Sequence, residues 1–122
     1  MKDPLLVCES ALEDMKAQDV KVISLKDRGT YTDNLIVATG TSSTHVQSIA
    51  DRIVEYLTKS GHIVDSIEGT PNNQWVIVDA GDVVVHVFQE EQRKLYNIEK
   101  LYVHDFDFDD DEKDAQGNLN AS

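Results

Sequence analysis

The chain has 122 residues, 40% of them hydrophobic, which is enough for one domain with an apolar core and leaves little room for a second. A single cysteine, Cys8, excludes an intrachain disulfide, and no segment approaches the run of about 20 apolar residues that a membrane-spanning helix needs. The formal net charge of −12 disfavours a groove that follows nucleic-acid phosphates and favours a basic protein surface as partner.

The first predicted elements are a helix and two strands. Apolar residues recur at helical spacing at Leu5, Cys8, Leu12 and Met15. This pattern predicts a helix over 4–17, with Asp3 as its N-cap. Two apolar runs, 20–25 and 35–39, predict strands joined by a polar turn. Only a short apolar run lies between Asp3 and Glu9, so we expect no signal peptide and a cytoplasmic protein.

The next segment contains the clearest amphipathic helix. Its apolar face consists of Val46, Ile49, Ala50, Ile53, Val54 and Leu57. Thr44 followed by Gln47 predicts a capping box at its start, and Gly61 is placed as the glycine that ends it. The preceding Gly-Thr-Ser-Ser turn has the composition of an anion site, but no basic residue accompanies it, so capping is favoured.

Three further strands and a helix are predicted in the second half, over 62–67, 75–78, 83–88 and 90–102. In the last helix, Arg93, Tyr96 and Lys100 recur on one stripe, which is ordinarily solvated surface and here is a plausible docking face. The order of elements predicts an α/β fold, with helices packed on a mixed sheet of about five strands.

The C-terminal segment differs in composition from the rest of the chain. Residues 105–122 contain seven acidic residues and one basic residue, with few apolar ones. This composition is typical of a disordered tail. The sequence therefore predicts one domain over 1–104 followed by an acidic tail over 105–122.

A hairpin is predicted where Trp75–Val78 and Val83–Phe88 flank a glycine turn. A turn centred on Ala80-Gly81 pairs Trp75 with His86 and places both on one sheet face, with Phe88 continuing it. Two interpretations stay open. The two side chains are a packed pair with the imidazole satisfied by a hydrogen bond, or Trp75 is an aromatic anchor for another protein.

Catalytic and metal sites find little support. Asp65 and Glu68 are three apart in a predicted strand, so they point to opposite faces and do not share a metal ion. Asp79 and Asp82 could converge at the hairpin turn, but acids beside a turn glycine commonly have a local role. Cys8 is expected in the core. We expect no cofactor and no metal, with a metal-dependent nucleotidyltransferase-like enzyme as the alternative function.

Three stretches of the sequence match a known family: DNLIVATGTSSTHVQSIADRI, then EG, then WVIVDAGDVVVHVFQEEQRKLYNIEKLY. They closely resemble the ribosomal silencing factor family, also called RsfS or Iojap-like proteins, over residues 5–102. The resemblance implies an α/β fold related in shape to nucleotidyltransferases but without their catalytic acids. It therefore implies a protein that is not an enzyme.

The function that the resemblance implies is repression of translation during starvation or stationary phase. Family members bind the large ribosomal subunit through its ribosomal protein numbered fourteen and sterically block association with the small subunit. The acidic charge of this chain adds the expectation of little direct nucleic-acid contact. The resemblance also implies a homodimer when free. By position, it implies that the partner is contacted by Trp75, Asp82, His86, Arg93, Tyr96 and Lys100.

Overall fold

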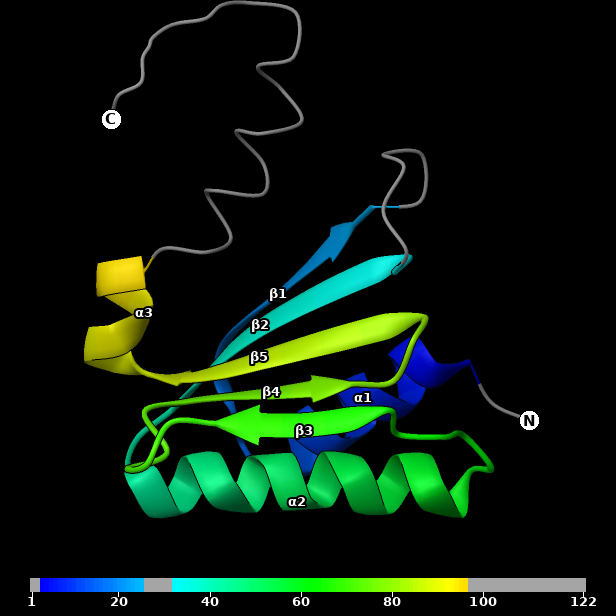
Figure 1. Cartoon of the computed structure of the whole chain (residues 1–122), viewed down its shortest axis with the longest axis horizontal. Coiled ribbons are helices and arrows are strands. Elements are labelled where there is room, and N and C mark those ends of the chain that lie inside the picture. The colour runs from blue at the N-terminus through cyan, green and yellow to red at the C-terminus, as the bar shows by residue number, and fades with distance from the viewer. Residues whose placement is uncertain (1–2, 26–31, 97–122) are drawn as a thin grey trace, which may run out of the picture.

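The computed structural model describes residues 3–25 and 32–96 and confirms the predicted α/β fold (Figure 1). In chain order the elements are α1 (Pro4–Asp14), β1 (Gln18–Ser24), β2 (Asn34–Gly40), α2 (Ser43–Lys59), β3 (Ser66–Gly69), β4 (Trp75–Asp79), β5 (Val83–Gln89) and α3 (Glu90–Tyr96). The predicted boundary at residue 104, and the part of the last predicted helix beyond Tyr96, lie outside the described residues.

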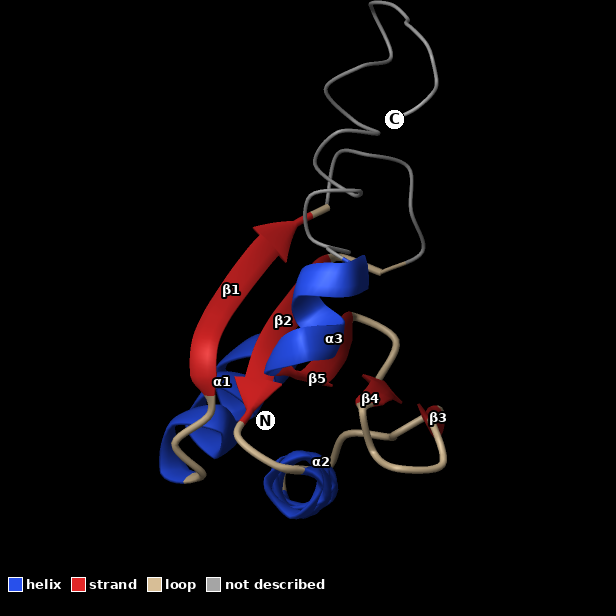
Figure 2. Cartoon of the chain, turned by 90° about the vertical axis from the view of Figure 1, so that its left-hand side faces the viewer, coloured by secondary structure: helices blue, strands red, loops and turns tan. Residues whose placement is uncertain are grey.

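The five strands form one mixed sheet in the order β1-β2-β5-β4-β3. Only β2 and β5 run parallel, and the other three neighbouring pairs are antiparallel. α1 and α2 lie together on one face of the sheet, and α3 lies on the opposite face, where β2 and β5 end (Figure 2). None of the described helices combines the length and the apolar character needed to cross a lipid bilayer.

The two faces of the sheet have separate apolar cores. The larger core fills the space under α1 and α2, and its most buried large side chains include Leu12, Ile49, Ile53 and Leu57. The smaller core lies on the other face and is formed by Leu25, Leu35, Val37, Val84 and Phe88. Because the central strands β2 and β5 contribute to both cores, they read as continuous apolar runs in the sequence.

The start of α1 is as predicted, but its end is earlier. The Asp3 carboxylate accepts a hydrogen bond from the Leu5 N–H at 2.9 Å, which confirms the N-cap. The helix ends at Asp14 rather than at residue 17. Lys16 there adopts a left-handed φ of 58° and turns the chain into β1.

The start of α2 corrects the predicted capping box. The N-cap is Ser42, whose hydroxyl accepts from the His45 N–H at 3.1 Å, while Thr44 lies inside the first turn. Gln47 bonds to Asp51 further along the helix instead of reaching back. Capping as the role of this turn is confirmed, and so is Gly61, which follows the helix with a φ of 86°.

The third strand begins later than predicted, at Ser66 instead of residue 62. His62 is still part of the helix end, because its N–H donates to the Leu57 carbonyl at 2.9 Å. The chain then crosses to the sheet, where Ser66 pairs with Asp79. Hydrophobic pattern alone does not separate this exit from a strand, since Ile63 and Val64 are apolar as well.

The hairpin register differs by two residues from the predicted one. Trp75 lies opposite Phe88, and Ile77 lies opposite His86. The turn is centred one residue later, on Gly81-Asp82, where Gly81 has a left-handed φ of 80°. Because the shift is even, every side chain keeps its predicted face, and only the partners change.

Candidate protein-binding surface

Trp75 is the first residue of β4 and is half-buried on the face that carries the smaller core. Its indole stacks on Phe88, with ring centroids 4.9 Å apart and an interplanar angle of 28°. The indole N–H donates to Nδ1 of His86 at 3.0 Å. The ring is therefore held in one orientation by two contacts within the chain.

His86 is buried, with 5% of its surface exposed. Burial lowers the pKa of His86 from 6.5 to about 4, so the ring is neutral at physiological pH. Since Nδ1 accepts the indole hydrogen bond, the ring proton lies on Nε2. The packed-pair interpretation is confirmed, and the structure places His86 behind Trp75 as its support rather than on the surface.

A hollow of about 180 Å³ lies beside Trp75 and is lined by Glu68, Gly69, Thr70, Trp75 and Ile77. Glu68 lies directly opposite Ile77 across the β3–β4 ladder, so its side chain belongs to the same face as the indole. The Thr70 hydroxyl accepts from the N–H groups of Gln74 and Trp75, at 2.9 and 3.2 Å, and fixes the connecting loop. The site therefore combines an aromatic wall, an aliphatic wall and a carboxylate.

Sequence reasoning considered Glu68 only as a metal ligand and did not place it beside Trp75. The signal that links them is the antiparallel pairing of β3 with β4, because Glu68 and Ile77 form one rung and Trp75 lies two residues before Ile77. That register depends on where β3 begins, which the predicted strand 62–67 misplaced.

Arg93 does not lie on a solvated stripe of α3, and this part of the prediction is wrong. Its guanidinium is buried, with the side chain 8% exposed. It donates to the hydroxyl of Thr39 at 2.8 Å and to the carbonyl of Asp19, whose carboxylate lies 3.6 Å away. Arg93 thus fixes α3 to the edge of the sheet where β1 is irregular.

In the part of the chain that the structure describes, the other predicted contact residues are not gathered around Trp75. α3 begins close to Trp75, because the Gln89 N–H donates to the Gln74 carbonyl at 2.9 Å. Tyr96 ends α3, and Lys100 lies outside the described residues. Asp82 is exposed in the hairpin turn at the other end of β4, more than about 13 Å from Trp75 at the usual strand rise.

The candidate chemical groups have structural roles. The Asp79 carboxylate accepts from the N–H of Gly81 at 2.9 Å, which is a local turn contact. Cys8 is fully buried in the larger core, as predicted, and burial together with Glu9 raises the pKa of its thiol to about 12. Within residues 3–25 and 32–96, no three His, Cys, Asp or Glu side chains are grouped to hold a metal ion.

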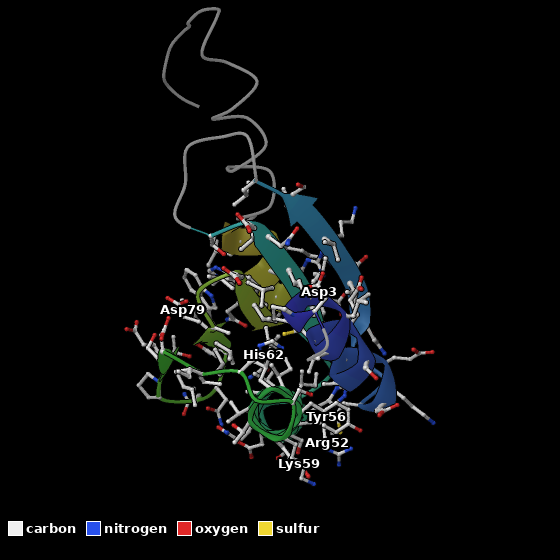
Figure 3. The ribbon with its side chains drawn as sticks, turned by 90° about the vertical axis from the view of Figure 1, so that its right-hand side faces the viewer. Asp3, Arg52, Tyr56, Lys59, His62 and Asp79 are labelled. Atoms are coloured by element: carbon white, nitrogen blue, oxygen red, sulfur yellow. The ribbon has the colours of Figure 1, made fainter. Side chains whose placement is uncertain are left out.

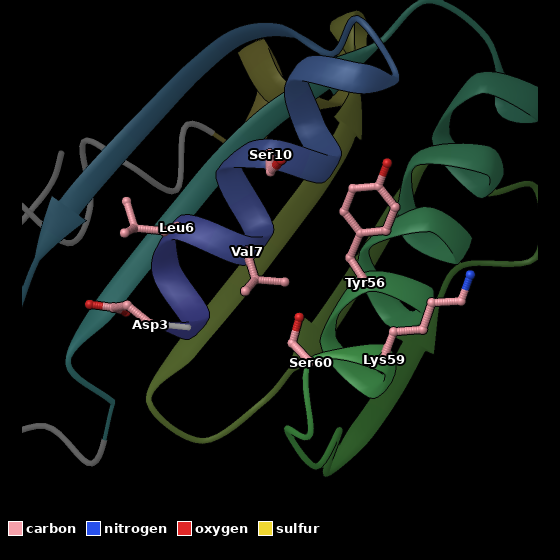
Figure 4. Close-up of a pocket in the computed structure, with 7 residues that line it drawn as sticks. All are labelled: Asp3, Leu6, Val7, Ser10, Tyr56, Lys59 and Ser60. Atoms are coloured by element: carbon pink, nitrogen blue, oxygen red, sulfur yellow. The ribbon is translucent and has the colours of Figure 1, made fainter. Parts of the chain in front are cut away.

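A larger hollow of about 450 Å³ lies on the other side of the molecule, between α1 and α2 (Figure 4). It is lined by Asp3, Leu6, Val7, Ser10, Tyr56, Lys59 and Ser60. Arg52, Tyr56 and Lys59 extend along one side of α2, away from Asp79 on the hairpin (Figure 3). The charged residues that line it, Asp3 and Lys59, have opposite signs, so this hollow has no marked charge preference.

Comparison with known proteins gives a consistent result. The family described as "Ribosomal silencing factor during starvation" matches residues 1–122. The ribosomal silencing factor RsfS of Bacillus subtilis is 36% identical over 101 residues, which cover 83% of this chain and 86% of that protein. Protein Iojap of Zea mays, which is chloroplastic, is 33% identical over 92 residues, covering 75% of this chain and 40% of that protein. A crystal structure of a protein from Chromobacterium violaceum superposes with a TM-score of 0.79 at 35% identity, covering 82% of this chain and 83% of that one.

Proposed function

The chain belongs to the ribosomal silencing factor family, and we propose that it silences ribosomes by binding protein number fourteen of the large subunit and so sterically excluding the small subunit. Membership makes it a ribosome-binding repressor of translation and not an enzyme, which removes the nucleotidyltransferase alternative. Exclusion needs only occupancy of the intersubunit face, and a standard interface of about 1,600 Å² in total suffices for that.

The observation that carries the proposed contact is the fixed indole of Trp75 beside an acidic hollow. Tryptophan offers a large contact area at low entropic cost. Here the indole is already fixed within the chain, so little further conformational entropy is lost on binding. In this proposal the partner is contacted by Trp75 and, elsewhere on the interface, by Asp82, Tyr96 and Lys100. His86 and Arg93 are both buried, so they act indirectly. His86 holds the indole of Trp75, and Arg93 holds α3 against the sheet.

The charge of the chain supports a protein partner over ribosomal RNA. A net charge of −12 is repelled by phosphates and attracted to the basic surface of a ribosomal protein. We therefore propose mainly protein-to-protein contact, with little direct contact to RNA. For a chain that acts as the bacterial relatives do, the place of action is the cytoplasm, whereas the plant relatives are chloroplastic or mitochondrial.

The proposed function is tested by sedimentation with purified ribosomal subunits. The chain should travel with large subunits and not with small ones, and an excess of it added before mixing should lower the fraction of joined ribosomes. Large subunits reconstituted without protein fourteen are the control, and they should neither bind the chain nor be silenced by it. Undisturbed formation of joined ribosomes at saturating amounts of the chain would refute steric exclusion.

We also propose that the free chain is a homodimer formed through the edge strand β1. Within the described sheet, β1 pairs on one side only, with β2, and Val20 and Val22 on this edge are each 40% exposed. An open, partly apolar strand edge favours pairing with a second strand.

Light scattering should give the free chain a molar mass twice that of the 13.7 kDa monomer. Val22→Lys should return the mass to that of the monomer, because a charge on the edge opposes strand pairing. Ile63→Lys, which changes a 76% exposed apolar side chain elsewhere, should leave the dimer intact. A wild-type chain that stays monomeric at all concentrations would exclude the dimer.

A further inference from the structure

The hollow beside Trp75 has a single kind of charge. Of the residues that line it, only Glu68 is charged, and its side chain is exposed. The carboxylate is therefore accessible to any group that enters the hollow and presents a negative charge to it. Phosphates and acidic side chains are repelled from such a site, and cations are attracted.

The shape of the hollow is set by the strand register. Glu68 forms a rung with Ile77, and Trp75 is its diagonal neighbour on the same face. Diagonal neighbours in an antiparallel ladder lie roughly 7–8 Å apart, with their Cβ atoms somewhat closer. A flat group inserted between them contacts the indole on one side and reaches the carboxylate on the other, with Ile77 beneath it.

The walls of the hollow are in place before a partner arrives. The indole is held by its hydrogen bond to His86 and by its stacking on Phe88. The loop before it is fixed by the Thr70 hydroxyl. A preformed site loses little conformational entropy on binding, so more of the contact energy appears as affinity.

We propose that this hollow binds one arginine side chain of the ribosomal protein partner, and that Glu68 selects it by charge. The guanidinium stacks on the indole of Trp75 and pairs with the Glu68 carboxylate, while the arginine methylene groups cover Ile77. Arginine fits better than lysine, because its planar cation stacks and donates hydrogen bonds at the same time. This inference rests on the proposed function and adds the chemistry of the contact.

The first test compares two charge removals in the full chain. Glu68→Gln should weaken binding to purified large subunits about 10-fold, the loss expected for one charge-assisted hydrogen-bonded pair. Its binding should also depend less on salt concentration. Glu13→Gln removes the same charge from an exposed position on α1 and should change the affinity less than about 2-fold. Equal affinities of the two variants would overturn the role of Glu68.

The second test needs no ribosome. Trp75 is the only tryptophan, so the protein has one indole N–H resonance. N-acetylarginine amide should shift this resonance, whereas N-acetylcitrulline amide, which has the same shape without the charge, should not. The shift should be lost in Glu68→Gln, and the unchanged spectrum of that variant would show that it is folded.

The outcomes separate this inference from the proposed function. Equal shifts with N-acetylcitrulline amide would overturn selection by charge. An equal or larger shift with Nα-acetyl-lysine amide, which keeps the charged side chain, would overturn the choice of arginine. If the wild type fails to bind large subunits, the proposed function fails, while the titration still reports on the hollow. If the wild type binds and Glu68→Gln binds equally well, the proposed function stands and this inference fails.

Discussion

Trp75→Ala is expected to lower the affinity of the chain for large ribosomal subunits by about 30- to 1,000-fold, or about 2–4 kcal/mol. The indole is fixed by His86 and Phe88, so its contact area is offered to a partner at low entropic cost. Truncation removes that area and one wall of the acidic hollow at the same time. Sedimentation with large subunits over a range of concentrations measures the change.

Two further variants make this expectation specific. Ile63→Ala shortens an apolar side chain that is 76% exposed and precedes β3, near the end of β4 opposite to Trp75, and its affinity should stay within about 2-fold of the wild type. Trp75→Phe keeps an aromatic ring above Phe88 but loses the hydrogen bond to His86, so an intermediate loss is expected. Because Trp75→Ala also removes the stacking on Phe88, its folded fraction is checked by circular dichroism at the assay temperature. Wild-type affinity in a folded Trp75→Ala protein would show that Trp75 is not the anchor.

Most of the fold is predictable because local pattern and tertiary burial agree. The face of α2 that repeats every three to four residues packs against the sheet, and β2 and β5 are buried on both sides as their continuous apolar runs indicate. The shared face of Trp75 and His86 was also predictable, because side chains alternate strictly along a strand. These features depend on periodicity, which is a property of the sequence alone.

The parts of the site that were not predictable depend on contacts between distant segments. Periodicity places Arg93 on a stripe of α3 but does not reveal that the carbonyl of Asp19 and the hydroxyl of Thr39 lie within its reach. The exact hairpin partners depend on where the turn is centred. Gly81, with its left-handed φ, is the first central residue of the observed turn Gly81-Asp82, whereas the predicted turn Ala80-Gly81 made it the second. Glu68 enters the site only through the register of β3.

The stability of the folded chain is expected to fall by about 3 kcal/mol between pH 6.5 and pH 4 through His86 alone. Burial lowers the pKa of His86 from 6.5 to about 4 in the folded state. Above pH 6.5 the ring is neutral in both states and contributes no pH dependence. Below pH 6.5 the imidazole is protonated in the unfolded chain but stays neutral in the folded chain. The free energy of unfolding therefore decreases by about 1.4 kcal/mol per pH unit until the folded ring is protonated as well.

Urea unfolding of the wild type and of His86→Gln at several pH values between 7.5 and 4 isolates this contribution. The glutamine side chain does not titrate and retains an acceptor for the indole N–H of Trp75. The other histidines and the many carboxylates titrate in both proteins, so they cancel in the difference between the two curves. That difference should be constant above pH 6.5 and should change steadily below it in favour of His86→Gln. Parallel curves down to pH 4 would mean that the folded chain accepts the proton as readily as the unfolded one, and that His86 does not hold Trp75 as a neutral acceptor.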